Sequence, residues 1–197
     1  MSPQDFKQLW QHSNDPLSPI SQEKVERLSL HAATIDFLTI AGLPKYAAPN
    51  LSFVNDSNDK GYGINKLIDQ YNFLIDSHEY ERYIVIGSCR DGNVIAVNTM
   101  EEDLIAQLDH EDLFSSTFFN SSIETLADFL IIYRDFEISV MAEHGEEGYR
   151  SCYFTDIQFD ELKAKMLKSD RRALMEKGFW KVELEIIIDL RQQNMDR

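Results

Sequence analysis

The sequence predicts an α+β fold, with helices toward both ends of the chain and a sheet of antiparallel strands between them. Three observations predict it. Apolar residues recur at helical spacing near the N-terminus and again over 123–136. Two runs rich in Val and Ile, "RYIVIGS" and "NVIAVNT", lie between these helical regions. The pair Asp91-Gly92 separates the two runs and favours a type I′ turn, so we expect a β-hairpin here.

The length and composition predict one soluble domain. The chain has 197 residues, of which 43% are hydrophobic and 11% aromatic, enough to fill a sizeable core. No apolar run is long enough to cross a membrane, and the polar N-terminus has no basic head before an apolar run, so we expect no secretory signal. Cys89 and Cys152 are the only cysteines, which favours a reducing cytoplasm over a disulfide framework.

Serine, proline and glycine mark helix ends in the first part of the chain. The Ser-Pro pairs at 2–3 and 18–19 each place an N-cap serine before a proline at the first helical position. A third helical stretch covers about 31–41. Gly42 then offers a left-handed C-cap, and Pro44 cannot continue a helix. We therefore expect helices before the sheet begins.

The middle of the chain predicts strands. "NLSFVN" (50–55) is a short strand candidate, whereas residues 64–76 are ambiguous between strand and helix. "DLIAQLDH" (103–110) is expected to follow the hairpin as the next strand of a meander. Strict alternation along the first hairpin strand would place Cys89 on the same face as Tyr83.

The remainder of the chain predicts helices. Ser121 and Glu124 have the spacing of a capping box, and apolar residues cover most of the following helix, so we expect it to pack against the sheet. Residues 142–154 are expected to form a loop. A helical pattern then continues toward the C-terminus, with a break at Gly178. Trp180 opens an amphipathic helix after that glycine, so we expect it in the core rather than in a binding site.

Negative charge is concentrated in one part of the chain. The net charge is -15 at pH 7, and residues 101–160 hold 15 acidic residues against only Arg134 and Arg150. This distribution argues against direct binding of nucleic acid, which needs a basic face. Two interpretations stay open: the acids serve solubility, or they form an acidic face that steers the protein toward a basic partner.

Cys89 lies between two glycines after an apolar run, as a nucleophile on a tight turn would. A nucleophile elbow needs a strand, a turn and then a helix, but a second strand follows here. His78 and His110 are candidate bases, and the sequence places neither beside the thiol. A cysteine-dependent hydrolase is therefore a remote alternative, and we expect no catalytic residue and no enzymatic activity.

Histidine and carboxylate residues cluster at 76–81, 108–112 and 143–147. None of these clusters has the spacing that puts two metal ligands on one helix face. Asp109 and His110 are adjacent on a predicted strand and so point to opposite faces. We expect no metal and no cofactor, although a weak divalent-cation site at 108–112 stays open. The sequence also lacks a phosphate-binding loop.

Four segments, taken in order, resemble a known family. They are "IDFLTIAGLPKYAAPNLSF" (35–53), the meander (82–112), "FFNSSIETLADFLIIYRDF" (118–136) and "KSDRRALMEKGFWKVELEII" (168–187). Their order and spacing resemble the SUKH superfamily, which includes bacterial toxin-immunity proteins, Syd and yeast cell-wall-synthesis regulators. The resemblance runs from about Ile20 to Ile188. Within the superfamily, the chain resembles the branch that carries a C-terminal Asp/Trp helical extension. Arg171 departs from the proline that often follows the C-terminal aspartate.

The resemblance implies an α+β domain in which helices flank a mainly antiparallel central sheet. It implies one domain over 1–197, with a helical lead-in at 1–19 and a helical extension at about 156–197. It also implies binding rather than catalysis: an immunity protein neutralises a cognate protein toxin, often a nuclease, of a bacterial polymorphic toxin system. The alternative is a regulatory or scaffold module that binds endogenous proteins, as Syd does. The oligomeric state stays open.

Acidic residues beside the third strand are the first candidates for contact with a basic toxin. Nucleases are basic where they grip phosphate, and complementary charge raises the rate of association. The candidates in the loops that flank this strand are Glu101, Glu102, Asp103, Asp109, Glu111 and Asp112, and those expected in the loop after the long helix are Glu143, Glu146 and Glu147. We expect direct contact with neither nucleic acid nor membrane.

Overall fold

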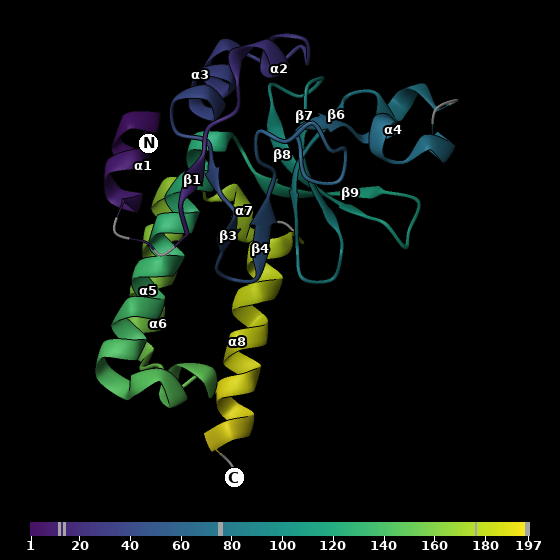
Figure 1. Ribbon diagram of the computed structural model, residues 1–197. Helices are drawn as coiled ribbons and strands as arrows, with labels where there is room; N and C mark the ends of the chain where they lie inside the picture. Colours follow the sequence, from purple (N-terminus) through teal and green to yellow (C-terminus); the bar gives the residue numbers. More distant parts are fainter. Residues whose placement is uncertain (12, 14, 75–76, 176, 196–197) are drawn as a thin grey trace.

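The computed structural model describes residues 1–11, 13, 15–74, 77–175 and 177–195. Its strands form a mainly antiparallel sheet, and its longest helices lie beside that sheet and extend well beyond it (Figure 1). The α+β class predicted from the sequence is confirmed.

The main sheet has the order β3-β4-β6-β7-β8-β9, with β5 paired to β6, and every pair is antiparallel. The bounds are β3 (Tyr46–Ala47), β4 (Leu51–Phe53), β5 (Asn65–Lys66), β6 (Tyr83–Ser88), β7 (Val94–Asn98), β8 (Leu104–Asp109) and β9 (Ser115–Asn120). Strands β6 to β9 follow one another in sequence and in space, so the predicted meander is confirmed. Two further short strands, β1 (Leu17–Ser18) and β2 (Leu43–Pro44), pair with each other.

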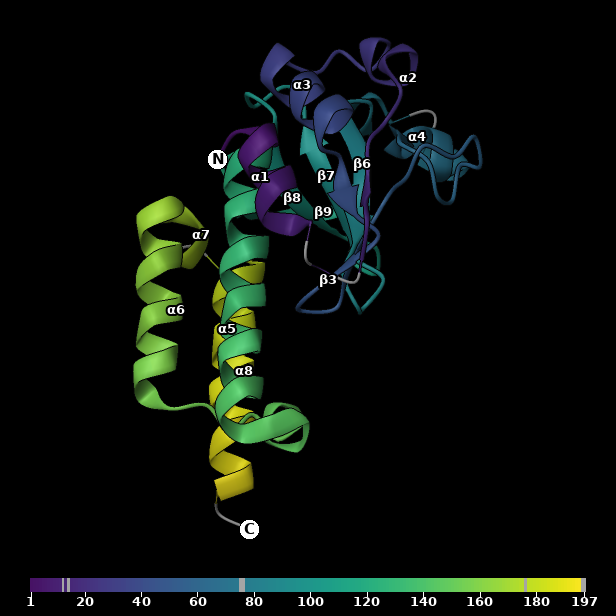
Figure 2. The ribbon, with the colours of Figure 1, turned by 60° about the vertical axis from the view of Figure 1, so that its left-hand side comes forward.

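Helices precede and follow the sheet. They are α1 (Pro3–Trp10), α2 (Gln22–Glu26), α3 (Ala32–Ile40), α4 (Leu67–Gln70), α5 (Ile123–Arg150), α6 (Asp156–Ser169), α7 (Arg172–Met175) and α8 (Phe179–Met195), with 3₁₀ turns at Asn72–Leu74 and His78–Tyr80. Figure 2 shows α5, α6 and α8 extending together away from the sheet. The ambiguous segment 64–76 therefore contains both a short strand and helical turns, and its last two residues lie outside the described part of the chain.

Of the three helix ends predicted in the first part of the chain, two are confirmed. The Ser2 hydroxyl caps α1 by accepting a hydrogen bond from the Asp5 backbone N–H at 3.1 Å. Gly42 has a φ of 67° after α3, as predicted, and a Cβ there would collide with the Ser18 carbonyl. The start predicted at 18–19 is wrong, because Ser18 pairs with Leu43 in a strand and α2 begins later.

The capping box of α5 is displaced by one residue from the prediction. Ser122 is the N-cap, and its side chain and backbone exchange hydrogen bonds with Thr125. Ser121 instead donates to the carboxylate of Asp170 from its backbone N–H at 2.7 Å and from its hydroxyl at 3.0 Å. A distant side chain thus decides which serine caps the helix.

Asp170 belongs to a buried polar network that connects the C-terminal helices to the sheet. Asn120, at the end of β9, donates to Asp170 at 3.4 Å and accepts from the indole N–H of Trp180 at 2.9 Å. Trp180 has no exposed surface, so its prediction as a core residue is confirmed. The network positions the start of α8 against both the sheet and α5.

Residues 142–144 and 146–150 are helical, so the loop predicted for 142–154 is wrong over most of its length. Helix α5 continues to Arg150 across a kink at Gly145, which has φ 70° and ψ 180°. This φ lies in the left-handed region that glycine reaches at little cost, and it lets the helix change direction.

The β6–β7 turn (89–93) differs from the predicted type I′ turn. Gly92 has a φ of 81°, but Asp91 does not have the positive φ that a type I′ turn needs. The backbone N–H of Gly92 donates to the carbonyl of Cys89 at 3.0 Å, and Cys89 pairs with Asn93. The predicted hairpin is confirmed, with a three-residue loop instead of a two-residue one.

An irregularity in β6 reverses the predicted face of Cys89. The pairing register shifts between Val85 and Gly87, so the residues after this point change sides. Cys89 consequently packs in the larger core with Ile84, whereas Tyr83 belongs to the smaller core on the other face of the sheet. This places the β6–β7 turn beside the helices α5 and α8.

Candidate functional site

The acidic candidates of the β7–β8 turn (99–103) differ in exposure. Glu101 and Glu102 are exposed, whereas Asp103 is only 2% exposed. An Oδ atom of Asp103 accepts a hydrogen bond from the backbone N–H of His31, the N-cap residue of α3, at 2.7 Å. Asp103 therefore holds the turn against α3, and its carboxylate is buried.

Asp109, Glu111 and Asp112 lie at the other end of the same strand. Glu111 and Asp112 are exposed in the β8–β9 turn (110–114), and Asp109 is half-buried at the end of β8. A six-residue strand at about 3.3 Å per residue separates the two turns by about 17 Å. The structure thus does not bring the two loop groups together.

Two apolar side chains are exposed here, one in the β8–β9 turn and one in the 3₁₀ turn Asn72–Leu74. Leu113 is 81% exposed and Phe73 is 75% exposed. Both are close to the buried Phe114, whose ring centroid lies 6.2 Å from that of Phe73 and 4.7 Å from that of Tyr71. The Tyr80 hydroxyl donates to the carbonyl of Leu113 at 2.7 Å and fixes the turn. We call Phe73, Asp109, Glu111, Asp112 and Leu113 the acidic–apolar patch.

Glu143, Glu146 and Glu147 are exposed around the kink of α5. Glu146 forms an ion pair with Arg150 at 2.6 Å on the helical turn that follows Gly145. These acids are therefore carried by helix rather than by a flexible loop.

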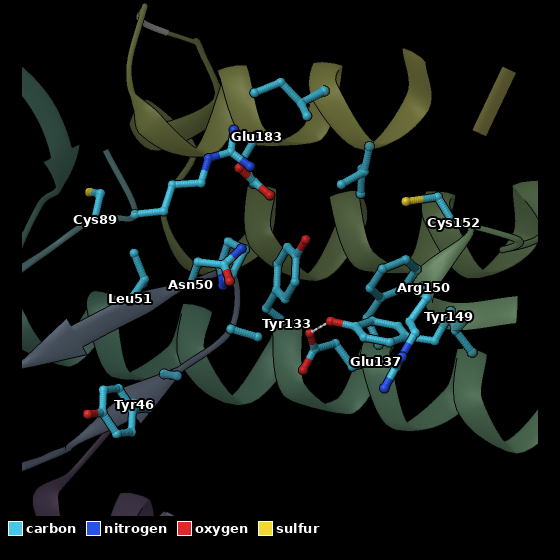
Figure 3. Close-up of a pocket in the computed structure, with 18 of the residues that line it drawn as sticks. Tyr46, Asn50, Leu51, Cys89, Tyr133, Glu137, Tyr149, Arg150, Cys152 and Glu183 are labelled. Carbon is cyan, nitrogen blue, oxygen red and sulfur yellow. Dashed lines mark hydrogen bonds between the residues drawn. The ribbon is translucent and has the colours of Figure 1, made fainter. Parts of the chain in front are cut away.

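A cavity of about 850 Å³ opens between α5, α8, the β6–β7 turn and the edge of the sheet at β3 and β4. Figure 3 shows Tyr133 pointing from α5 toward Glu183 on α8, with Glu137 and Tyr149 farther along. Cys89 and Cys152 lie toward opposite ends of this view. The cavity thus combines buried carboxylates with aromatic rings.

The Glu137 carboxylate accepts a hydrogen bond from the Tyr149 hydroxyl. Burial raises the pKa of Glu137 above its usual value, although this hydrogen bond acts in the opposite direction. Within the described part of the chain, no lysine, arginine or histidine nitrogen forms an ion pair with Glu137. When ionised, the Glu137 carboxylate therefore has no cationic partner among the described residues.

Glu183 is 7% exposed on the inner side of α8. Burial raises the pKa of Glu183. The positive charge of Arg90 opposes this rise, and the negative charge of Asp91 adds to it. Burial also raises the pKa of Tyr133, so its hydroxyl stays protonated and able to donate. Arg90 itself forms an ion pair with Asp91, at 3.5 Å.

The variant Glu183→Gln is expected to unfold at a higher denaturant concentration than the wild type near pH 7. The carboxyl titrates near 4.5 in the unfolded chain and at a higher pH in the folded protein, so its ionised form destabilises the fold at neutral pH. Below pH 4.5 both states are protonated, and the advantage of the variant disappears. Urea unfolding of both proteins between about pH 7 and pH 4 measures this.

Glu185→Gln is the matched control for this prediction, since Glu185 is exposed on the same helix. It is expected to leave stability nearly unchanged across the same pH range. A stabilisation of Glu183→Gln that stays constant with pH would contradict the assigned cause.

Cys89 is 5% exposed and lines the cavity. Burial, followed by the charge of Asp91, raises the pKa of its thiol to about 12. Gln107 approaches the sulfur at 3.5 Å, and the described cavity lining contains no histidine that could act as a base. A thiol with this pKa is protonated at neutral pH, so the hydrolase alternative gains no support.

No group of three or more His, Cys, Asp or Glu side chains that could hold a metal ion occurs among the described residues. In the segment 108–112, the Nδ1 atom of His110 lies 2.9 Å from the side-chain oxygen of Asn93. Over all the described residues, no helix is long and apolar enough to cross a membrane.

The sequence interpretation missed Glu137 and Glu183. A signal was present, because Glu183 lies between Trp180 and Ile187 on the buried stripe of its helix. A carboxylate on an apolar helix face is almost never fully buried without a partner. Its meeting with the α5 side chains depends on tertiary packing, which the local pattern does not contain.

These features define an α+β protein with exposed acidic side chains and an open cavity between its sheet and its C-terminal helices. The sequence family described as SUKH-4 immunity protein matches residues 2–186. The chain belongs to this family, and the predicted membership of the SUKH superfamily is confirmed. Family membership implies that the chain binds a cognate toxin protein. No curated protein and no solved structure matches it.

Proposed function

We propose that the protein is a cytoplasmic immunity protein that neutralises a cognate toxin of a polymorphic toxin system by binding it. Membership of the SUKH-4 immunity protein family is the observation that carries this proposal. The toxin is a nuclease with a basic surface, and the acidic residues of this chain occupy that surface in place of nucleic acid. The protein acts by occlusion, and no chemical step is required of it.

The acidic–apolar patch is our assignment for the first contact with the toxin. Interfaces combine apolar anchors with charges at their rim, and Leu113 and Phe73 are exposed apolar groups beside three acids. Complementary charge raises the encounter rate more than it raises affinity. Glu143, Glu146 and Glu147 add negative charge around the kink of α5, and Asp103 has no part because it is buried.

Co-expression tests the immunity role directly. The toxin encoded beside this gene should arrest growth alone, and this chain should restore growth and co-purify with it. Growth that remains arrested although both proteins are folded and abundant would disprove the immunity role.

Reversing the charge of the acidic–apolar patch is expected to slow association with that toxin. The variant Glu111→Lys/Asp112→Lys should lower the association rate constant by about tenfold or more at low salt, and by much less at high salt, where charges are screened. Stopped-flow or biolayer measurements of the two proteins give this rate.

Glu101→Lys/Glu102→Lys is a matched control at the opposite end of β8. It changes the net charge by the same amount and should slow association less. Equal slowing by both variants would show that net charge alone acts, and an unchanged rate in both would refute the acidic surface.

A further inference from the structure

The cavity between α5 and α8 has the size and composition of a ligand site. Its volume of about 850 Å³ is within the range of small-molecule pockets. One wall comes from β3, β4 and the β6–β7 turn, and the others come from α5 and α8. Because these elements are far apart in sequence, the cavity exists only in the folded chain.

Two carboxylates face this cavity from different helices. Glu137 lies on α5 and Glu183 on α8, and neither forms an ion pair within the described part of the chain. The two arginines that line the cavity are paired elsewhere, Arg90 with Asp91 and Arg150 with Glu146. Arg90 still acts on Glu183 through its charge, so Glu137 is the less compensated of the two.

Aromatic rings complete the lining. Tyr133 and Tyr149 lie beside the carboxylates, and Phe136 and Phe154 are also part of the wall. Aromatic faces attract guanidinium and ammonium groups, and a carboxylate hydrogen-bonds to both. An anion would meet two negative charges here, and an apolar group would leave both carboxylates buried without a cation.

We infer that this cavity receives a basic side chain, an arginine or a lysine, that the toxin inserts on binding. The inference rests on the proposed function, and it adds the chemical class of the toxin side chain that enters the cavity. The inserted cation pairs with Glu137 and stacks against the tyrosines. A source in a protein partner follows from charge complementarity, since the buried Glu137 and Glu183 form no ion pair in the described part of the chain and the cavity residue Arg150 is paired with the exposed Glu146.

The variant Glu137→Gln tests the inference because it keeps the shape of the side chain and an acceptor for Tyr149. It is expected to weaken toxin binding by about 30-fold or more, mainly through faster dissociation, since a desolvated charge pair loses one partner. Glu183→Gln should weaken binding by a smaller factor. Glu185→Gln, exposed on α8, should bind the toxin as the wild type does.

A probe separates this inference from the proposed function. N-acetyl-arginine amide, titrated into the free protein, should shift the NMR signals of Tyr133 and Tyr149, and the neutral isostere N-acetyl-citrulline amide should not. The Glu137→Gln variant should abolish the shifts. Spermidine tests the alternative that the cavity binds a free polyamine. We expect it to bind no more tightly than the arginine probe.

Two outcomes would overturn the inference. One is a toxin that binds Glu137→Gln and Glu183→Gln as tightly as it binds the wild type, which leaves the immunity role intact. The other is selective, tight binding of spermidine together with unchanged toxin affinity in these variants. If the wild type binds no toxin, the proposed function fails. In that case the arginine probe still tests the cation site, which is refuted if the free protein does not bind the probe.

Discussion

Replacing Trp180 with alanine is expected to lower the free energy of unfolding by about 3–5 kcal/mol, the range for large aromatic side chains removed from a core. Trp180 is fully buried and contacts the rings of Phe119 and Phe129 at centroid distances of 5.4 and 5.1 Å. The change would leave a cavity where β9, α5 and α8 meet. It would also leave the side-chain oxygen of Asn120 without its donor.

Circular dichroism during urea unfolding measures this change and does not depend on the fluorescence of the lost indole. The variant Trp180→Phe retains most of the apolar contact and loses the hydrogen bond to Asn120, so it should be less destabilised, by about 1–3 kcal/mol. Val182→Ala alters a half-exposed side chain on the same helix and should cost about 0.5 kcal/mol or less. A loss below about 1 kcal/mol for Trp180→Ala would contradict the central role of this side chain.

The features that the sequence predicted well depend on short-range rules. The meander follows from β-branched runs separated by turn residues, and the C-cap at Gly42 follows from the need for a positive φ. The core position of Trp180 follows from the period of its helix. Each of these outcomes is decided by residues a few positions apart.

The features that were predicted wrongly depend on distant residues. Ser121 has the sequence of an N-cap, but Asp170, 49 residues later, accepts both of its hydrogen bonds, so Ser122 takes that position. The register shift in β6 is equally invisible in the local pattern, and it moved Cys89 to the other face.

The same distinction applies to the candidate site. The count of charges along the sequence identified the acidic segment. In the structure, the candidate acids of this segment lie at the two ends of β8 and around the kink of α5. Glu137 and Glu183 are 46 positions apart in the sequence and both face the cavity because α8 is placed beside α5. The residues that hold α8 in place are therefore prerequisites for the cavity, although Asp170 and Trp180 are not among the residues that line it.

Asp170 is a residue of this kind, and its replacement has the largest expected effect on stability after that of Trp180. The variant Asp170→Ala removes the acceptor for the backbone N–H and hydroxyl of Ser121 and for the side-chain amide of Asn120. Asp170 is 5% exposed, so these donors would stay largely without water. Because these buried donors would lose their acceptor, we expect the free energy of unfolding to fall by about 2–4 kcal/mol.

The loss should also appear locally, because Asn120 connects Asp170 to Trp180 at the start of α8. Hydrogen exchange of the backbone amides in α7 and α8 should accelerate more than exchange in β7 and β8. Asp170→Asn keeps one acceptor oxygen and should lose less stability, and Asp160→Ala, an exposed aspartate on α6, should lose almost none. Uniform acceleration across sheet and helices would show instead that Asp170 supports the whole fold, with no particular role in holding α8 against the cavity.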